Sequence, residues 1–521
     1  MLKKWPKLIS FIEKHFLLII LFGYLLLTLP ALLDTNHFLY NLEPYPDGIL
    51  YSLSGKSFWL GNGLKLIFEF GEKSHWVPPI YSVILGVGAI TLKQPFAFYL
   101  TNILIQVLFL STFYWILKQT TKSKWIRIIG MLSLLGHSLL FLLPSIPMTE
   151  NLTIFFFTLM IASFFVKGNK KFILMALSVV GMLFTRYSIF PVIMGGIIII
   201  PLLSLRKTSL KQRIGIGLVT TTLFLISLWF LSLRNINVFN FVKSVLSNNS
   251  SWQGTRFIFL NLITYAKMLF LNKGLFLWLN IGLTNFIFTG MFFTSLFVLF
   301  KKKMWQKFWI LFVLFFAQFP LQLVFYVADA RYLIYSIPLV VLGVVWLIDA
   351  LPKKRRLLIP MAIFGIFLQL FMQRSLVRQI VADNLLGRST AWQYEAIKHF
   401  DSVLKNDSLV ITALPPFLVD AYQEKSYRAL PLSYTQEFMN KKQYIWGGDL
   451  NHANLTESYK QWINEGKTIH ISNSYITHHK SVINDFEKFK EEFSFELISS
   501  GCENACNIYK LDIRDTNNEI E

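Results

Sequence analysis

The chain has 521 residues, of which 54% are hydrophobic and only 15% are charged. A soluble domain has too little interior to hide that much apolar surface, so the composition argues against a soluble protein and favours an integral membrane protein. A net charge of +21 in such a chain reflects basic cytoplasmic loops, and we expect no nucleic-acid partner. With two cysteines, Cys502 and Cys506, a disulfide-rich scaffold and a four-cysteine zinc site are excluded.

Apolar runs of about 17–25 residues can cross a bilayer as helices. The sequence predicts about eleven such spans, and hence a polytopic α-helical membrane protein. In chain order they lie near residues 16–33, 96–117, 127–144, 151–166, 172–185, 188–204, 214–233, 275–300, 308–327, 333–349 and 357–372.

Clusters of Lys and Arg alternate with these spans. With eleven spans every cluster falls on one side, while the short loops on the other side carry almost no Lys or Arg. Because basic loops stay in the cytoplasm, this pattern predicts a multi-pass protein of the cell membrane with a cytoplasmic N-terminus and an extracytoplasmic C-terminus. The clusters are Lys3, Lys4, Lys7 and Lys14; Lys118, Lys122, Lys124 and Arg127; Lys167, Lys170 and Lys171; Arg206, Lys207, Lys211 and Arg213; Lys301, Lys302, Lys303 and Lys307; and Lys353, Lys354, Arg355 and Arg356.

The segment Trp76–Leu92, "WVPPIYSVILGVGAITL", has an alternative interpretation as a further span. If it crossed the membrane, every later basic loop would lie outside. Its two prolines and its glycines also weaken a spanning helix. We therefore expect an interfacial or re-entrant helix within one long external loop, residues 34–95.

The tail from 375 to 521 is more charged than the rest. Helical stretches such as "TAWQYEAIKHFDSVLK" alternate there with short apolar runs such as "SLVITAL" and "FELISS". This alternation predicts a small extracytoplasmic α/β domain at 375–521, after a transmembrane domain at 1–374. Cys502 and Cys506 bracket a predicted turn, where a disulfide and free thiols are both open.

Ionisable and polar residues gather at the predicted external ends of the spans. The first external loop contributes Asp47 in "YPDG", then Tyr51, Lys56 and His75. Later loops contribute Glu150, Arg186, Asp329 and Arg331. Ionisable groups near a membrane are costly and often functional, so together these residues suggest an external site.

Each candidate also has a purely structural explanation. Pro-Asp-Gly favours a turn by itself. Glu150 follows Thr149 at a helix start, where a negative charge is favourable. The arginines can anchor the chain at the interface, Asp329 can pair with Arg331, and His75 can be a surface residue.

Four motifs are similar to those of the GT-C superfamily of polytopic glycosyltransferases, especially the branch of the protein O-mannosyltransferases and the lipid A aminoarabinose transferases. They are "YPDGILYSLSGKSFWLGNG", "HWVPPIYSVILGVG", "PMTENLTIFFFTLMIASFF" and "DARYLIYSIPLVVL", within about residues 10–350. One departure is Gly48, where many relatives carry a second acidic residue.

The resemblance implies a GT-C-like membrane glycosyltransferase. It would transfer a hexosyl or pentosyl group from a polyprenyl-phosphate-linked sugar to a glycan, lipid or protein acceptor, with the donor's lipid tail among the spans. By matching position, Asp47 is the general base. Glu150 is the second catalytic carboxylate, which assists acceptor orientation or, if a metal is used, its ligation. The other roles are donor-phosphate binding by Arg331, Arg186 and Lys56, and acceptor or sugar binding by Tyr51, His75 and Asp329.

The resemblance requires no cofactor. A divalent cation is an option that two carboxylates are too few to assign.

A transporter or flippase of lipid-linked sugars is the main alternative. It predicts charges near mid-membrane and repeated groups of spans, and neither is clear in the sequence. A polysaccharide polymerase or ligase, which usually carries its main loop late in the chain, and a scaffold that binds a partner through the tail are further alternatives.

Overall fold

A computed structural model gives the fold of the chain. It describes residues 15–26, 28, 46–68, 71–74, 78–92, 96–137, 139–145, 148–204, 218, 221–222, 225, 229, 243, 245–248, 253–276, 279–280, 282–374, 391–414, 419–420, 423–432, 452–474, 476 and 480–514.

Contacts divide the chain into two compact units. The helical unit comprises Met1–Ala31, Val77–Tyr81 and Asn102–Leu386. The mixed unit comprises Leu32–Trp76, Ser82–Thr101 and Gly387–Glu521. This grouping differs from the predicted division after residue 374, because most of the first loop belongs with the C-terminal region rather than with the helices.

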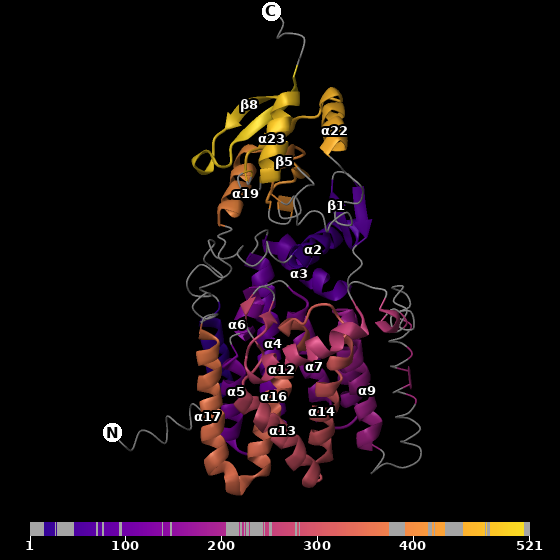
Figure 1. Ribbon diagram of the computed structural model, residues 1–521, viewed down its shortest axis with the longest axis vertical. Helices are drawn as coiled ribbons and strands as arrows, with labels where there is room; N and C mark the ends of the chain where they lie inside the picture. The colour runs from indigo at the N-terminus through magenta and orange to yellow at the C-terminus, as the bar shows by residue number, and fades with distance from the viewer. Residues whose placement is uncertain are drawn as a thin grey trace, which may run out of the picture. The chain divides into compact units, whose positions relative to one another are not determined.

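The helical unit is a bundle of apolar helices (Figure 1). Besides the first helix, His15–Leu26, the described part of this unit contains α4 (Phe96–Thr120, in this unit from Asn102), α5 (Lys124–Leu135), α6 (Leu139–Leu142), α7 (Glu150–Ser163), α8 (Lys170–Leu183), α9 (Phe190–Ser204), α12 (Ile258–Phe270), α13 (Phe286–Lys301), α14 (Trp305–Phe316), α15 (Phe319–Gln322), α16 (Ser336–Ala350) and α17 (Arg355–Met372).

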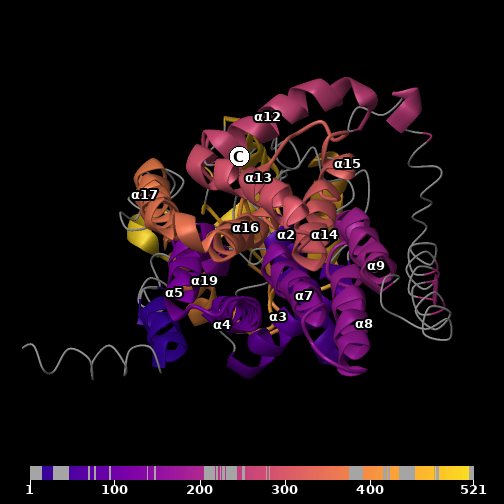
Figure 2. The same ribbon diagram turned by 90° about the horizontal axis from the view of Figure 1, so that it is seen from below.

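Helix α16 lies within the bundle and packs against α5, α13, α14 and α17 (Figure 2). All of its residues except Asp349 are buried, which is the pattern of a helix that other helices surround. Gly343 permits the close contact with α13, because a Cβ atom there would lie 2.7 Å from the Phe292 ring.

Among the described residues, two helices are long and apolar enough to cross a membrane, Leu100–Thr120 and Pro352–Met372. Six further apolar helices have 10–17 residues. The predicted count of eleven spans and their orientation therefore stay predictions, and almost all of the expected span at 214–233 lies outside the described residues.

Two expected spans are interrupted. The one at 127–144 is divided into α5 and α6 around Gly136 and His137. The one at 308–327 ends as α14 at Phe316, and a separate short helix, α15, contains Pro320 in its first turn. Proline has no backbone N–H with which to continue the preceding helix, so it favours a new helix start.

The span expected at 275–300 is wrong in its first part. Residues Leu275–Phe276 (β3) and Leu279–Asn280 (β4) pair as a short antiparallel ladder. Helix α13 starts later, at Phe286, because Asn285 caps it. The Asn285 Oδ1 accepts hydrogen bonds from the backbone N–H groups of Ile287 and Phe288, each at 3.1 Å.

The region 234–273, expected to be an external loop, contains α12. Most of its exposed side chains are apolar, with Phe259 74% exposed, and Lys267 in the last turn is the charged exception. Its inner face carries the buried Asn261, whose Nδ2 donates to the carbonyls of Leu323 and Phe325 at 2.9 and 2.6 Å. An apolar outside and a polar inside suit contact with lipid rather than with water.

The mixed unit begins with α2 (Pro46–Ser57), a π-helical turn (Phe58–Asn62) and the antiparallel hairpin of β1 (Lys65–Phe68) and β2 (Gly71–Ser74). Helix α3 (Pro79–Leu92) enters this unit at Ser82. The helix expected within Trp76–Leu92 is thus present, whereas its position against a membrane stays a prediction.

Helices α2 and α3 make a close backbone contact through two glycines. A Cβ atom on Gly86 would lie 2.3 Å from the backbone of Gly55, and one on Gly55 would lie 2.0 Å from the carbonyl oxygen of Ser82. The Trp59 Nε1 also donates to the Val83 carbonyl at 2.8 Å. The glycines therefore fix the spacing of the two helices.

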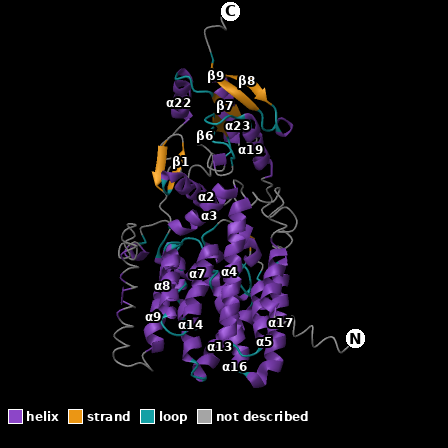
Figure 3. Cartoon of the chain, turned by 180° about the vertical axis from the view of Figure 1, so that it is seen from behind, coloured by secondary structure: helices purple, strands orange, loops and turns teal. Residues whose placement is uncertain are grey.

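The C-terminal part of the mixed unit is an α/β domain with a five-stranded sheet of order β6-β5-β7-β9-β8 (Figure 3). Strands β6, β5 and β7 are parallel, and β9 and β8 add antiparallel at one side. Every residue of the central β5 is buried, as is usual for parallel strands. The elements are α19 (Ala391–Val403), β5 (Leu409–Thr412), β6 (Arg428–Pro431), α22 (His452–Asn464), β7 (Ile469–Ser472), α23 (Lys480–Glu492), β8 (Phe493–Ser499) and β9 (Ile508–Ile513).

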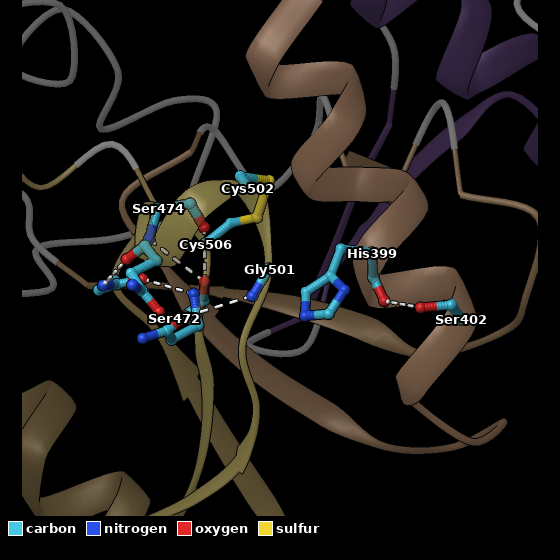
Figure 4. Close-up of a disulfide and its surroundings, with 10 residues drawn as sticks. His399, Ser402, Ser472, Ser474, Gly501, Cys502 and Cys506 are labelled. Carbon is cyan, nitrogen blue, oxygen red and sulfur yellow. Dashed lines mark hydrogen bonds between the residues drawn. A yellow bond between two sulfur atoms is a disulfide. The ribbon is translucent and has the colours of Figure 1, made fainter.

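Cys502 and Cys506 form a disulfide in the turn between β8 and β9 (Figure 4). Of the two alternatives that the sequence left open, the structure has the disulfide. The turn packs against α19, where a Cβ atom on Gly501 would lie 2.5 Å from the His399 ring. The Asn507 backbone N–H donates to Asn473 Oδ1 at 2.7 Å and so ties the turn to the end of β7.

Candidate active site

The candidate residues fall into two groups. Glu150, Arg186, Asp329 and Arg331 lie in the helical unit, where the structure brings them together. Asp47, Tyr51 and Lys56 lie on α2 in the mixed unit. The backbone of Asp47 is the second residue of α2, and its side chain is outside the described atoms, as is the whole of His75.

Glu150 and Arg186 form a buried ion pair. Glu150 is the first residue of α7, and Arg186 is extended just before the short 3₁₀ helix Tyr187–Ile189. The guanidinium Nη1 contacts the carboxylate Oε1, and the Arg186 Nε donates to Ser188 Oγ at 2.7 Å. Thr149 Oγ1 donates to the other carboxylate oxygen at 3.3 Å. Arg186 is therefore held from two sides.

Asp329 and Arg331 form a local pair. The Asp329 Oδ1 accepts the backbone N–H of Arg331 at 2.9 Å and so caps the 3₁₀ helix Ala330–Leu333. The second oxygen, Oδ2, lies 3.5 Å from the Arg331 Nε. The pairing of Asp329 with Arg331, which the sequence offered as a structural explanation for both residues, therefore occurs in the structure.

The ring of Tyr332 brings the two arginines together. The guanidinium carbon of Arg186 lies 5.4 Å from the ring centre and that of Arg331 lies 4.9 Å from it. Arg331 Nη2 also donates to the Tyr332 hydroxyl at 3.1 Å. The arginines are near enough to repel each other electrostatically, and the ring's negative face compensates part of that cost.

The four charged side chains differ in how far they are exposed to solvent. The Glu150 side chain is 2% exposed and lies behind Arg186, whereas that of Arg331 is 23% exposed. A substrate can therefore reach Arg331 more readily than Glu150. This arrangement favours a positioning role for Glu150 over the catalytic role expected from its place in the sequence.

Sequence reasoning missed two tyrosines next to this cluster. Tyr335 lies beside both Glu150 and Arg186, and Tyr265 lies beside Asp329 and Tyr332. Tyr265 is on α12, in a segment expected to be a loop, so no pattern pointed to it. Tyr335 sits one helical turn after Tyr332, but nothing in its local sequence indicates its distant partners.

The Pro-Pro segment contacts the turn that carries Arg186. The backbone N–H of Ile80 donates to the Phe184 carbonyl at 3.0 Å. The Tyr81 hydroxyl donates to Asn102 Oδ1 at 2.8 Å, and Asn102 Nδ2 donates to the Pro144 carbonyl at 3.2 Å. The start of α3 thus supports the backbone just before Arg186.

Lys56 is engaged within the mixed unit. Its Nζ donates to the Asp420 carbonyl at 3.1 Å and links α2 to the C-terminal domain. Burial lowers the pKa of Lys56, and the nearby Asp420 charge opposes that shift. Tyr51 is buried on the same helix, 8% exposed. Their expected roles in binding the donor phosphate and the acceptor stay predictions.

Metal binding has little support in the described residues. They contain no group of three or more His, Cys, Asp or Glu side chains placed to hold an ion. Glu150 and Asp329 are each paired with an arginine. No metal is therefore assigned a role.

The succession of elements along the chain agrees with the fold expected from the sequence. A bundle of apolar helices that carries an arginine–carboxylate cluster, followed in the chain by a small α/β domain, is the arrangement expected from the resemblance to GT-C enzymes. No family model and no curated protein sequence matches this chain.

Two solved structures of ArnT from Cupriavidus metallidurans are similar to it. The structure bound to undecaprenyl phosphate has a TM-score of 0.56 and 11% sequence identity, over 94% of this chain and 98% of that chain. The apo structure has a TM-score of 0.55 and 11% identity over the same shares. The GT-C fold expected from the sequence motifs is thereby confirmed.

Proposed function

We propose that this protein is a membrane glycosyltransferase that takes its sugar from a polyprenyl-phosphate-linked donor and passes it to an extracytoplasmic acceptor. The observation that carries the proposal is the fold shared with ArnT over 94% of the chain, one of whose solved structures holds undecaprenyl phosphate. The arginine cluster supplies a chemical reason, since a leaving lipid phosphate needs cations beside it.

Arg331 and Arg186 are the proposed donor-phosphate ligands. Guanidinium groups bind phosphate oxygens through paired, charge-assisted hydrogen bonds. Glu150, Asp329 and the Tyr332 ring already offset part of the repulsion between the two guanidinium groups. A phosphate that contacts both groups would reduce this repulsion further. Glu150 orients Arg186, and Lys56 is a weaker candidate because its ammonium already binds the Asp420 carbonyl.

Asp47 is the proposed general base. The acceptor's nucleophile, such as a hydroxyl oxygen, bonds to the anomeric carbon of the donor sugar. The bond from that carbon to the phosphate oxygen breaks, the acceptor proton passes to the Asp47 carboxylate, and polyprenyl phosphate leaves. Tyr51 and His75, on the same predicted loop, are the proposed acceptor-binding residues, with Asp329 as a further sugar-binding candidate.

Donor turnover by the purified protein tests this function. Wild type, Asp47→Asn and the exposed control Glu491→Gln are incubated with a panel of polyprenyl-phosphate sugars and an extract containing acceptors. We expect wild type and the control to consume one donor, and Asp47→Asn to be slower by about 10²–10⁴-fold, as is typical for loss of a general base. Equal turnover by all three would contradict the role of Asp47. No turnover of any donor would favour the transporter or flippase alternative.

A further inference from the structure

Asp329 has two separate tasks, one for each carboxylate oxygen. Its Oδ1 caps the 3₁₀ helix by accepting the Arg331 backbone N–H at 2.9 Å. This bond fixes the carboxylate next to the arginine that follows it. Its Oδ2 is thereby held beside the guanidinium of Arg331, where the side chain of Asp329 is only 6% exposed.

The contact between Oδ2 and Arg331 is loose. Their separation is 3.5 Å, whereas charge-assisted hydrogen bonds between nitrogen and oxygen are usually about 2.7–2.9 Å long. The negative charge still attracts the guanidinium, but it does not hold it by a short bond. An anion that forms two short bonds to the same guanidinium can therefore displace this contact.

The second arginine differs in this respect. Arg186 contacts Glu150 closely, donates to Ser188, and its carboxylate partner is almost completely buried. Arg331 is the more exposed of the two cations. Of the two ion pairs in this cluster, the one between Asp329 and Arg331 therefore has the longer contact and the more exposed arginine.

We propose that Asp329 is an internal competitor for the lipid phosphate, occupying Arg331 when the site is empty and weakening the binding of phosphate at that arginine. This inference rests on the proposed function, in that it takes a lipid phosphate as the ligand of the site. Its benefit is product release, because a polyprenyl phosphate would leave more slowly if no carboxylate competed for Arg331.

Asp329→Asn separates the two tasks, because the asparagine carbonyl oxygen can keep the helix cap while the negative charge is lost. The probe is undecaprenyl phosphate, titrated onto the full-length protein in detergent and followed by microscale thermophoresis. We expect Asp329→Asn to bind it more tightly, with a Kd lower by on the order of tenfold, for loss of one nearby like charge at a partly exposed site.

Two further variants show where the gain comes from. Asp349→Asn removes a carboxylate that lies at the same 3.5 Å from another arginine, Arg355, at the opposite end of α16, and its Kd should equal that of wild type. Combining Asp329→Asn with Arg331→Gln should abolish the gain, because the competition acts at Arg331.

An unchanged or higher Kd in Asp329→Asn would overturn the inference, as would an equal gain in Asp349→Asn. Absence of binding by both wild type and Asp329→Asn would overturn it too. Failure of this inference leaves the proposed function standing if the donor-turnover experiment succeeds. Conversely, Asp329→Asn could bind undecaprenyl phosphate more tightly than wild type although no donor is turned over. In that case the proposed function would fail and the competition by Asp329 would stand.

Discussion

At the scale of single residues, burial decides what the charged groups of the helical unit can do. Glu150 and Asp329 are both acids at the start of a helix. In the structure Glu150 is almost completely buried and pairs closely with Arg186. Asp329 instead accepts the backbone N–H of Arg331, and its second oxygen lies 3.5 Å from the Nε of that more exposed arginine. We therefore expect the two acids to respond very differently to substitution.

Glu150→Gln should lower the stability of the helical unit by about 3–5 kcal/mol, because it leaves the Arg186 charge buried without its partner. Thermal unfolding in detergent, followed by circular dichroism, measures the loss. Asp329→Asn, which keeps its cap, should unfold near the wild-type temperature.

The double variant Glu150→Leu with Arg186→Met provides the control for that prediction. Replacing both members of a buried ion pair by apolar side chains is often neutral for stability. The double variant should therefore unfold near the wild-type temperature and still fail to consume donor. A wild-type unfolding temperature for Glu150→Gln alone would contradict the buried pairing.

At the scale of elements, two glycines determine how the helix that carries Asp47 is supported. Helix α2 contacts α3 through Gly55 and Gly86 with no room for a side chain. From the sequence, Gly86 counts only as a residue that weakens a membrane span, and Gly55 has no role of its own. Their common role becomes visible once the two helices are placed against each other.

Gly86→Ala should reduce donor turnover by at least about tenfold. The added methyl group would separate α2 from α3 and move Asp47 together with α2. Small misplacements of reacting groups lower the reaction rate strongly. Gly290→Ala is the matched control, since a Cβ atom there meets nothing within 4 Å. Turnover assays of both variants measure the effect. If Gly86→Ala keeps wild-type turnover, the α2–α3 contact does not position the base.

At the scale of the whole molecule, the disulfide and the charge pattern point to the same topology. Disulfides persist in oxidising compartments outside the cytoplasm. Cys502 and Cys506 lie in the C-terminal domain, which the alternation of basic loops also predicts to be extracytoplasmic. The two lines of reasoning are independent, because one uses thiol chemistry and the other uses loop charge.

Labelling of intact cells with a membrane-impermeant maleimide tests this topology. Cys502 and Cys506 should react only after an impermeant reductant has opened the disulfide. In a background of Cys502→Ser and Cys506→Ser, Lys301→Cys should react only after the membrane is permeabilised, since Lys301 belongs to a predicted cytoplasmic cluster. Labelling of Lys301→Cys in intact cells would contradict the predicted orientation.

The sequence by itself predicted a helical membrane protein and the places of most of the described helices, because hydrophobicity and composition are local properties of the chain. It also included Glu150, Arg186, Asp329 and Arg331 in a larger set of candidates, since charges at the ends of apolar runs are conspicuous, but it did not show which of the candidates lie together. Its errors were local as well: α12 was too short and too polar on one face to be recognised, and the Asn285 cap placed the start of α13 later than hydrophobicity indicated.

Only the tertiary structure decided which charges pair, which tyrosines surround them and which glycines join α2 to α3. These features depend on contacts between segments far apart in the chain, and a single sequence carries no record of them. The tertiary structure also distinguished a sealed ion pair from a loose one. That difference in burial and distance is what leaves Arg331, rather than Arg186, more open to the phosphate that we propose as ligand.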